Sequence, residues 1–352
     1  MSNLYRRSTQ HTRYQQPSNW RRIRTIDMHT GGEPLRVIVE GFPALKGEGV
    51  LAYRQYLRDH HDDLRRALMF EPRGHADMYG CLLTPPNDET GDFGILFMHN
   101  EGYSTMCGHA IIAIIRLAVE MGWVEIREPE TKLRIDAPCG RIEGFASIRD
   151  GAAEELFFFG VPSFVLALDR QAEVPGWGQV RYDLAYGGAF YAYVDAKALN
   201  LALTPDNNRR IIEAGRSIKE AVRQSNPEIV HPFEADLSFL YGVIFIADSD
   251  TPGIHSLNVC VFADGELDRS PTGSGVMGRL AIHQARGEIS NGETLRIESI
   301  VGSVFSGAVV EELTYGPHQA IIPRIGGSAF ITGQHEFLID PDDPLKEGFL
   351  LR

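Results

Sequence analysis

The sequence predicts an α/β (α+β) protein made of two similar halves, and three observations support this. Runs of alternating apolar and polar residues, as at 36–40 and 187–194, are typical of strands. Apolar residues recur with helical spacing at 110–121, 205–224 and 275–286. The third observation is an internal repeat, in which a helix and the strand after it occur twice.

The repeat pairs MCGHAIIAIIRLAVEMG with PTGSGVMGRLAIHQARG and, further along, KLRIDAPCG with TLRIESIVG (106–122, 271–287, 132–140 and 294–302). Cys107 and Gly122 are separated by 15 positions, as are Thr272 and Gly287. Each copy therefore predicts a turn, a helix that ends at a glycine C-cap, and a strand. Two such copies indicate a duplicated unit in which Cys107 and Thr272 occupy equivalent positions.

Length and composition are those of a folded globular protein without a nucleic-acid or membrane partner. The 352 residues are enough for two domains, with 43% apolar and 23% charged residues. A formal net charge of −13 argues against partners that carry phosphate, because these bind clustered lysine and arginine. No apolar run approaches the roughly 20 residues that span a bilayer.

Residues 1–24 depart from this acidic balance. They contain six arginines separated mostly by Gln, Ser and Thr, namely Arg6, Arg7, Arg13, Arg21, Arg22 and Arg24. We expect a basic, solvated N-terminal arm. A transit peptide is the alternative, whereas the apolar core of a secretion signal is missing from this segment.

The four cysteines, Cys81, Cys107, Cys139 and Cys260, form no CxxC pair. Their spacing predicts neither a zinc site nor a disulfide framework, so we expect reduced thiols, no bound metal and a cytoplasmic location. The His-His-Asp-Asp run at 60–63 does not change this expectation. Adjacent residues of a helix point in different directions, so the run indicates a solvated face.

Cys107 and Thr272 each precede the first turn of a predicted helix. The free N–H groups of a helix N-terminus attract anions, and neighbouring glycines let a ligand approach the backbone. A cysteine in this position can have its pKa lowered from ~8.5 to ~3.5–7.5, so Cys107 is a candidate base. The alternative is a small buried cysteine, which we expect for Cys81, Cys139 and Cys260.

The residues around both helices resemble the proline racemase family. The stretch Met106-Cys107-Gly108-His109 is similar to the first catalytic motif of that family. The stretch DRSPTGSG at 268–275 is similar to the second motif, whose fifth position is usually cysteine. Further matches are IDMHTGGE, YGGAFY and DPDDP (26–33, 186–191 and 340–344). The resemblance runs from about Thr25 to the C-terminus.

The resemblance implies a fold like that of diaminopimelate epimerase, with two pseudo-symmetric halves, each a curved β-sheet around a central helix. On this basis we expect residues 25–160 and about 333–352 to form the half that carries Cys107. Residues 161–332 are expected to form the half that carries Thr272. The family also implies a homodimer.

The same resemblance implies a proline-type amino acid held between the halves. Its carboxylate is expected to bind the backbone amides of four residues, Gly108, His109, Gly273 and Ser274. Asp268 is expected to hold the ring nitrogen, and Phe262 to form a wall of the pocket. The alternative for Asp268 is to cap the turn that follows it.

Thr272 stands where racemases and epimerases of this family carry their second cysteine. Such enzymes need a base on each face of the α-carbon, and a threonine hydroxyl stays protonated at physiological pH. The Cys/Thr pair resembles the cofactor-free branch that dehydrates trans-3-hydroxy-L-proline to Δ1-pyrroline-2-carboxylate. We expect Cys107 to remove the α-proton, and Cys107 or His109 to protonate the leaving hydroxyl. Thr272 is expected to orient the substrate without transferring a proton to carbon.

Three alternatives stay open at this point. A 4-hydroxyproline 2-epimerase or proline racemase would require a second proton-transferring residue. A non-catalytic amino-acid-binding protein would bind the same ligand without turnover. A nicotinamide-dependent oxidoreductase is suggested only by the GxGxxG match at 273–278, where the polar segment 267–271 replaces the buried strand of a dinucleotide fingerprint.

Overall fold

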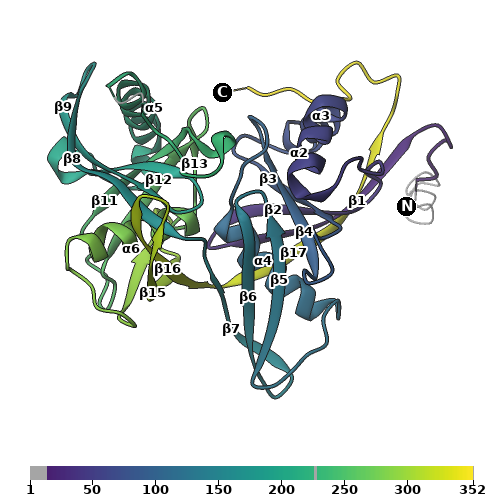
Figure 1. Ribbon diagram of the computed structural model, residues 1–352. Coiled ribbons are helices and arrows are strands. Elements are labelled where there is room, and N and C mark those ends of the chain that lie inside the picture. Colours follow the sequence, from purple (N-terminus) through teal and green to yellow (C-terminus); the bar gives the residue numbers. More distant parts are fainter. Residues whose placement is uncertain (1–13, 226–227, 352) are drawn as a thin grey trace, which may run out of the picture.

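The computed structural model describes residues 14–225 and 228–351, which form two halves side by side (Figure 1). The first half contains β1 (Arg21–Thr30), β2 (Glu33–Glu40), α2 (Gly49–His60), α3 (Asp62–Met69), β3 (Tyr79–Thr84), β4 (Phe93–His99), α4 (Gly108–Glu120), β5 (Glu130–Ala137), β6 (Gly140–Arg149), β7 (Ala152–Phe159) and β17 (Ala329–Ile339). The second half contains β8 (Ser163–Val174), β9 (Gly178–Tyr186), β10 (Phe190–Asp195), α5 (Asn208–Ser225), β11 (Leu240–Ala247), β12 (Ser256–Phe262), β13 (Glu266–Leu267), α6 (Gly273–Ala285), β14 (Thr294–Glu298), β15 (Val304–Tyr315) and β16 (His318–Gly327). Short 3₁₀ turns lie at Lys197–Leu199, Pro205–Asn207 and Ala235–Leu237.

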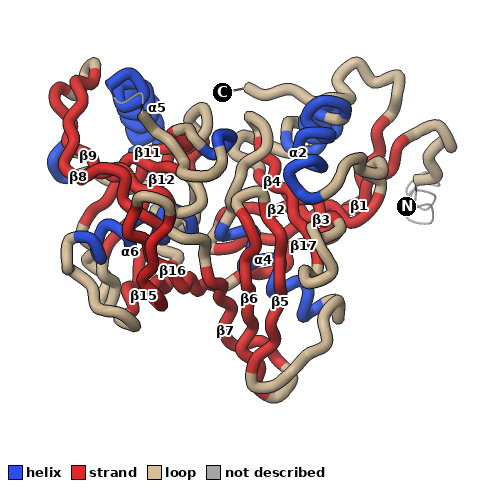
Figure 2. Tube along the Cα trace, viewed as in Figure 1, coloured by secondary structure: helices blue, strands red, loops and turns tan. Residues whose placement is uncertain are grey.

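A buried helix lies at the centre of each half. In α4 every residue from Gly108 to Val119 except Arg116 is buried, because the helix is apolar on all sides. It contacts β1, β2, β6, β7 and β17 and also β16 and α6 of the other half, while α6 contacts β8, β9, β10, β12, β15 and β16. Figure 2 shows both helices enclosed by strands. The predicted pair of halves, each a curved sheet around a helix, is confirmed.

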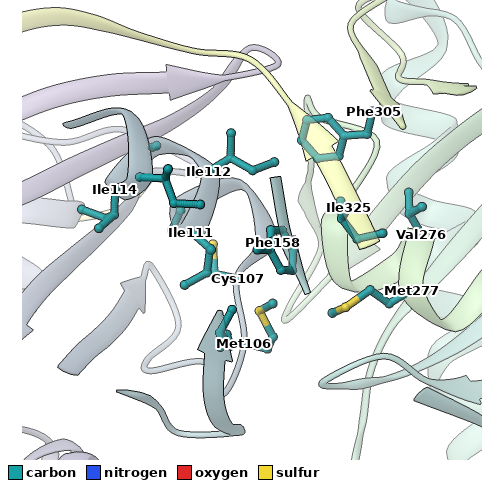
Figure 3. Close-up of a cluster of buried hydrophobic side chains, with 14 of the residues drawn as sticks. Met106, Cys107, Ile111, Ile112, Ile114, Phe158, Val276, Met277, Phe305 and Ile325 are labelled. Carbon is teal, nitrogen blue, oxygen red and sulfur yellow. The ribbon is translucent and has the colours of Figure 1, made fainter. Parts of the chain in front are cut away.

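The hydrophobic core continues from one half into the other. One cluster contains residues of α4 and α6 together with Phe158 on β7 and Phe305 on β15. Figure 3 shows Phe158 between Ile111 of α4 and Met277 of α6, with Cys107 between Ile111 and Met106. The start of α4 is therefore held by packing between the halves, which fixes where Cys107 lies.

The predicted helices begin or end within a few residues of the observed ones. The helices α4 and α6 both start two residues earlier than the apolar spacing indicated, because glycine and polar residues occupy their first turns. The helix predicted at 205–224 divides into a 3₁₀ turn and α5. The strand predicted at 187–194 begins only at Phe190, since Gly188, with φ of 90°, turns the chain between β9 and β10.

The chain passes into the second half after β7 and returns to the first half with β17. The strand β17 pairs with β1 along its whole length, from Thr30 opposite Ala329 to Arg21 opposite Ile339. It begins four residues before the boundary that we expected at about 333. We propose that the chain consists of two units divided near residue 160 and near the start of β17.

The basic arm expected at 1–24 falls largely on residues 1–13, outside the described part of the chain. Its last arginines do not belong to an arm, because Arg21, Arg22 and Arg24 lie in β1. Arg22 and Arg24 each donate a hydrogen bond to Glu40 on the neighbouring strand over 3.1 Å. All three arginines are part of the sheet through the backbone pairing of β1 with β17, and Arg24 also pairs with β2.

Within residues 14–225 and 228–351, no helix is both long and apolar enough to cross a membrane. In the same part of the chain, no group of three or more His, Cys, Asp or Glu side chains is arranged to hold a metal. All four cysteines are free thiols, of which Cys81, Cys107 and Cys260 are buried.

Candidate active site

The two central helices begin at the same place between the halves. Cys107 is the N-cap residue of α4, and Thr272 is the N-cap residue of α6. A Cβ atom built on Gly108 would lie 2.7 Å from the Cα of Gly273, and one built on Gly273 would lie 2.8 Å from the Cα of Gly108. Only glycine permits this approach, so the two helix N-termini meet backbone to backbone.

A small cavity of about 20 Å³ lies at this meeting point. Its walls include all eight residues that we predicted for the site, namely Cys107, Thr272, Gly108, His109, Phe262, Asp268, Gly273 and Ser274. The remaining lining residues are Tyr79, Met106, Tyr191 and Tyr241. This volume is about that of one water molecule.

The thiol of Cys107 is buried beside the ring of His109. Its Sγ atom lies 3.2 Å from Nδ1 and 3.5 Å from Nε2 of His109. Burial raises the pKa of Cys107 well above its usual value, although the backbone amide of Ala110 and the hydroxyl of Tyr79 act in the opposite direction. The raised pKa of Cys107 contradicts our expectation of a lowered one. The helix N-terminus does stabilise the thiolate, but the loss of water costs more.

His109 is a neutral imidazole at neutral pH. Burial lowers its pKa to about 4, against the opposing effects of Asp268 and a hydrogen bond with the backbone of Pro34. Its carbonyl oxygen accepts a hydrogen bond of 2.8 Å from the hydroxyl of Thr30 at the end of β1. This bond anchors the first turn of α4. A neutral ring next to the thiol can accept its proton or donate its own.

Thr272 is hydrogen-bonded to Asp268, and both residues line the cavity. Its hydroxyl donates a hydrogen bond of 2.7 Å to Oδ2 of Asp268, whose Oδ1 accepts a bond of 2.7 Å from the amide of Ser270. The amide of Thr272 donates in turn to the hydroxyl of Ser270 over 3.1 Å. Thr272 has φ of 63° and ψ of 96°, a conformation that β-branched residues rarely adopt. Asp268 thus holds the strained turn at the start of α6.

Aromatic side chains from several strands complete the walls. The ring of Phe262 lies 5.5 Å from that of Tyr241 and 6.3 Å from that of Tyr79. Tyr191 exchanges a hydrogen bond of 2.7 Å with the hydroxyl of Ser274. Sequence reasoning missed the three tyrosines as site residues. They lie in β3, β10 and β11, where an aromatic residue is as typical of a core strand as of a pocket.

A model of the family described as proline racemase matches residues 25–350. The chain belongs to the proline racemase family. Among its relatives, the trans-3-hydroxy-L-proline dehydratase of Colwellia psychrerythraea is 52% identical over 330 residues, which cover 94% of this chain and 93% of the relative. The 3-hydroxyproline 2-epimerase of Burkholderia multivorans is 46% identical over 332 residues, covering 94% and 99%.

Solved structures of the proline racemase family share this fold. The hydroxyproline epimerase of Agrobacterium vitis, determined with bound trans-4-hydroxy-L-proline, is 33% identical and superposes with a TM-score of 0.87. The superposition covers 94% of this chain and 96% of that protein. The resemblance to this family, and the epimerase-like fold that it implied, are therefore confirmed.

Proposed function

We propose that the protein dehydrates trans-3-hydroxy-L-proline to Δ1-pyrroline-2-carboxylate. The observation that carries this proposal is the unequal pair at the two helix N-termini. Cys107 can ionise, whereas the hydroxyl of Thr272 stays protonated and donates a hydrogen bond to Asp268. A racemase or epimerase of this fold needs a base on each face of the α-carbon. The dehydratase name of the Colwellia relative supports the same activity.

The substrate carboxylate is proposed to bind where the helices meet. The amides of Gly108, His109, Gly273 and Ser274 belong to the first turns of α4 and α6, where N–H groups have no partner within the helix. Two helix N-termini that face one anion favour negative charge through their dipoles as well as their N–H groups. These donors also stabilise the enolate-like charge that develops on the carboxylate when the α-proton leaves.

The ring nitrogen of the substrate is proposed to bind Asp268. The carboxylate of Asp268 is buried in the cavity wall, where a cationic nitrogen offsets its charge. That cation also offsets the effect of Asp268 on Cys107, since the charge of Asp268 contributes to the raised pKa of the thiol. Substrate binding therefore favours the thiolate that the reaction requires.

In the reaction Cys107 takes the proton from the α-carbon. The electron pair of the broken C–H bond forms the double bond to the neighbouring carbon, and the C–O bond electrons leave with the hydroxyl, which is protonated to water. The enamine that remains tautomerises to the cyclic imine. Every step uses the substrate and side chains of this chain, so we propose that no cofactor takes part. Activity of dialysed, EDTA-treated protein tests this point.

Incubation of the purified protein with trans-3-hydroxy-L-proline tests the proposed function. We expect loss of one water and formation of a cyclic imine, measured by mass spectrometry and by reduction of the imine to proline. Inversion of 4-hydroxyproline or proline, with no imine from the 3-hydroxy substrate, would instead identify an epimerase or racemase. Binding without turnover would identify an amino-acid-binding protein.

We also propose that the protein acts as a homodimer in the cytoplasm. The family resemblance supports the dimer, and the free thiols of all four cysteines are compatible with a reducing compartment. Light scattering of the purified protein gives its mass in solution, and fractionation of cells gives its location. A monomeric mass, or recovery with a membrane or secreted fraction, would contradict the corresponding part of the proposal.

A further inference from the structure

Tyr241 lines the cavity, and its hydroxyl lies beside that of Tyr79. Tyr241 lies on β11 and is 8% exposed, and apart from the hydroxyl of Tyr79 its oxygen has no hydrogen-bond partner among residues 14–225 and 228–351. A phenol can donate one hydrogen bond and accept others, and buried polar groups normally use this capacity. Because Tyr241 is in the wall of the cavity, a group of the bound substrate can supply the further partner.

A second phenol connects Tyr241 with Cys107. The hydroxyl of Tyr79 is hydrogen-bonded to that of Ser104 and also favours the thiolate of Cys107. The hydroxyls of Tyr79 and Tyr241 lie close enough for each to influence the pKa of the other. Phe262 packs against both rings and holds them on the same wall. The thiol of Cys107 and the hydroxyls of Tyr79 and Tyr241 thus form a row of groups that can exchange protons.

The stereochemistry of the substrate places the leaving hydroxyl on this side of the cavity. In trans-3-hydroxy-L-proline the hydroxyl is on the face of the ring opposite the carboxylate, which is also the face of the α-proton. If Cys107 takes that proton, the hydroxyl projects toward Cys107 and the phenols next to it. Burial raises the pKa of Tyr79 and of Tyr241 well above the usual value, so both are neutral donors.

We propose that Tyr241 is the general acid that protonates the leaving hydroxyl, and that Tyr79 returns a proton to it from Cys107. This inference rests on the proposed dehydratase function. When the C–O bond breaks, its electron pair stays on oxygen, which takes the phenolic proton of Tyr241 and leaves as water. Cys107 by then carries the former α-proton as a thiol. Transfer of a proton from Cys107 to Tyr79, and from Tyr79 to Tyr241, restores the thiolate and both phenols.

The test compares Tyr241→Phe with a matched control, Tyr186→Phe. Tyr186 is a buried tyrosine whose hydroxyl makes no hydrogen bond within the described part of the chain, and it lies in the core of the second half and outside the cavity. Loss of a general acid typically costs 10²–10⁴-fold in rate. We expect Tyr241→Phe to lower kcat on trans-3-hydroxy-L-proline about 100-fold or more, and Tyr186→Phe to leave it within about threefold.

Two further measurements separate protonation of the leaving group from general support of the pocket. L-Proline has the same ring and carboxylate but no hydroxyl, so its inhibition constant is expected to be the same for wild type and Tyr241→Phe. Fluoride needs no proton to leave, so we expect wild type to convert trans-3-fluoro-L-proline and Tyr241→Phe to retain most of that rate.

Failure of the proposed function and failure of the inference about Tyr241 give different results. Absence of imine formation by the wild type defeats the proposed function itself. If the wild type is active, three results contradict the inference. One is a kcat of Tyr241→Phe on trans-3-hydroxy-L-proline that stays within about threefold of wild type, and another is a variant that loses as much rate on trans-3-fluoro-L-proline as on the hydroxy substrate. The third is an inhibition constant for L-proline that rises in parallel with the loss of kcat. Cys107 or His109 would then be the acid. Should Tyr241→Phe not fold, Tyr79→Phe takes its place, and full activity of that variant overturns the proposed proton transfer.

Discussion

The hydroxyl of Thr272 donates its proton to Asp268 over 2.7 Å, at the position that Cys107 occupies in the other half of the molecule. Both residues are N-caps of central helices, but they differ in their side-chain chemistry and in their backbone, with φ of −149° at Cys107 and 63° at Thr272. One side of the cavity carries a group that can ionise. The other carries a hydroxyl that stays protonated at physiological pH, which makes it a poor base.

Cys107→Ser is expected to abolish dehydration, with a loss of about 10³-fold or more, because serine does not ionise near neutral pH. Cys139→Ser is the control, since Cys139 is a partly buried free thiol outside the cavity. The rate of imine formation measures both variants. Unchanged activity of Cys107→Ser would show that the thiol is not the base.

Thr272→Cys is expected to restore proton transfer on the second face of the α-carbon, provided that the strained turn persists. In deuterium oxide the variant should incorporate deuterium into L-proline or trans-4-hydroxy-L-proline with inversion, which chiral chromatography detects. Thr272→Ser keeps a hydroxyl and should show no inversion. A folded cysteine variant that gives no inversion would indicate that residue 272 does not face the substrate.

Gly108→Ala is expected to destabilise the protein, since the new methyl group would lie 2.7 Å from the Cα of Gly273. The two helix starts must then separate, at a cost of about 1–3 kcal/mol as for other overpacked cores. Gly333→Ala is the control, because only the end of the His335 side chain lies within 3.4 Å of its added Cβ. Chemical unfolding measures both. Equal stabilities would contradict the close contact of the helices.

Acid is expected to destabilise the fold through His109. Its pKa is lowered to about 4 in the folded protein, below the ~6.5 of an unfolded chain. The unfolded state therefore binds the proton first, and stability falls as the pH drops from about 6.5 to 4, by about 3 kcal/mol in total. In His109→Gln this part of the pH dependence should disappear. Urea unfolding at pH 7 and pH 4.5 gives the change in the free energy of unfolding for wild type and for His109→Gln. The same change in both proteins would show that His109 is not the source of this pH dependence.

The internal repeat predicted more of this site than any single motif. Equal spacing of Cys107 and Thr272 from their glycine C-caps indicated equivalent helix starts, and the backbones of Gly108 and Gly273 indeed meet there. Local sequence carries this information because a helix start is defined by its own residues. The structure brings all eight predicted side chains and amides to one cavity.

The parts that escaped prediction depend on packing between distant segments. Tyr79 and Tyr241 face the cavity because β3 and β11 belong to different halves that meet there, and alternation within each strand does not indicate this. The raised pKa of Cys107 likewise follows from complete burial, which the helix N-terminus alone does not indicate. Arg21, Arg22 and Arg24 were assigned to an arm because their strand partners are far away in the sequence.

Incubation with trans-3-hydroxy-L-proline in deuterium oxide, followed by chiral analysis of product and remaining substrate, tests the asymmetry of the site most directly. One base predicts cyclic imine as the product and no inverted amino acid at any time. Accumulation of deuterated cis-3-hydroxy-D-proline would show that a second residue delivers a proton to the opposite face, and would contradict the role assigned to Thr272.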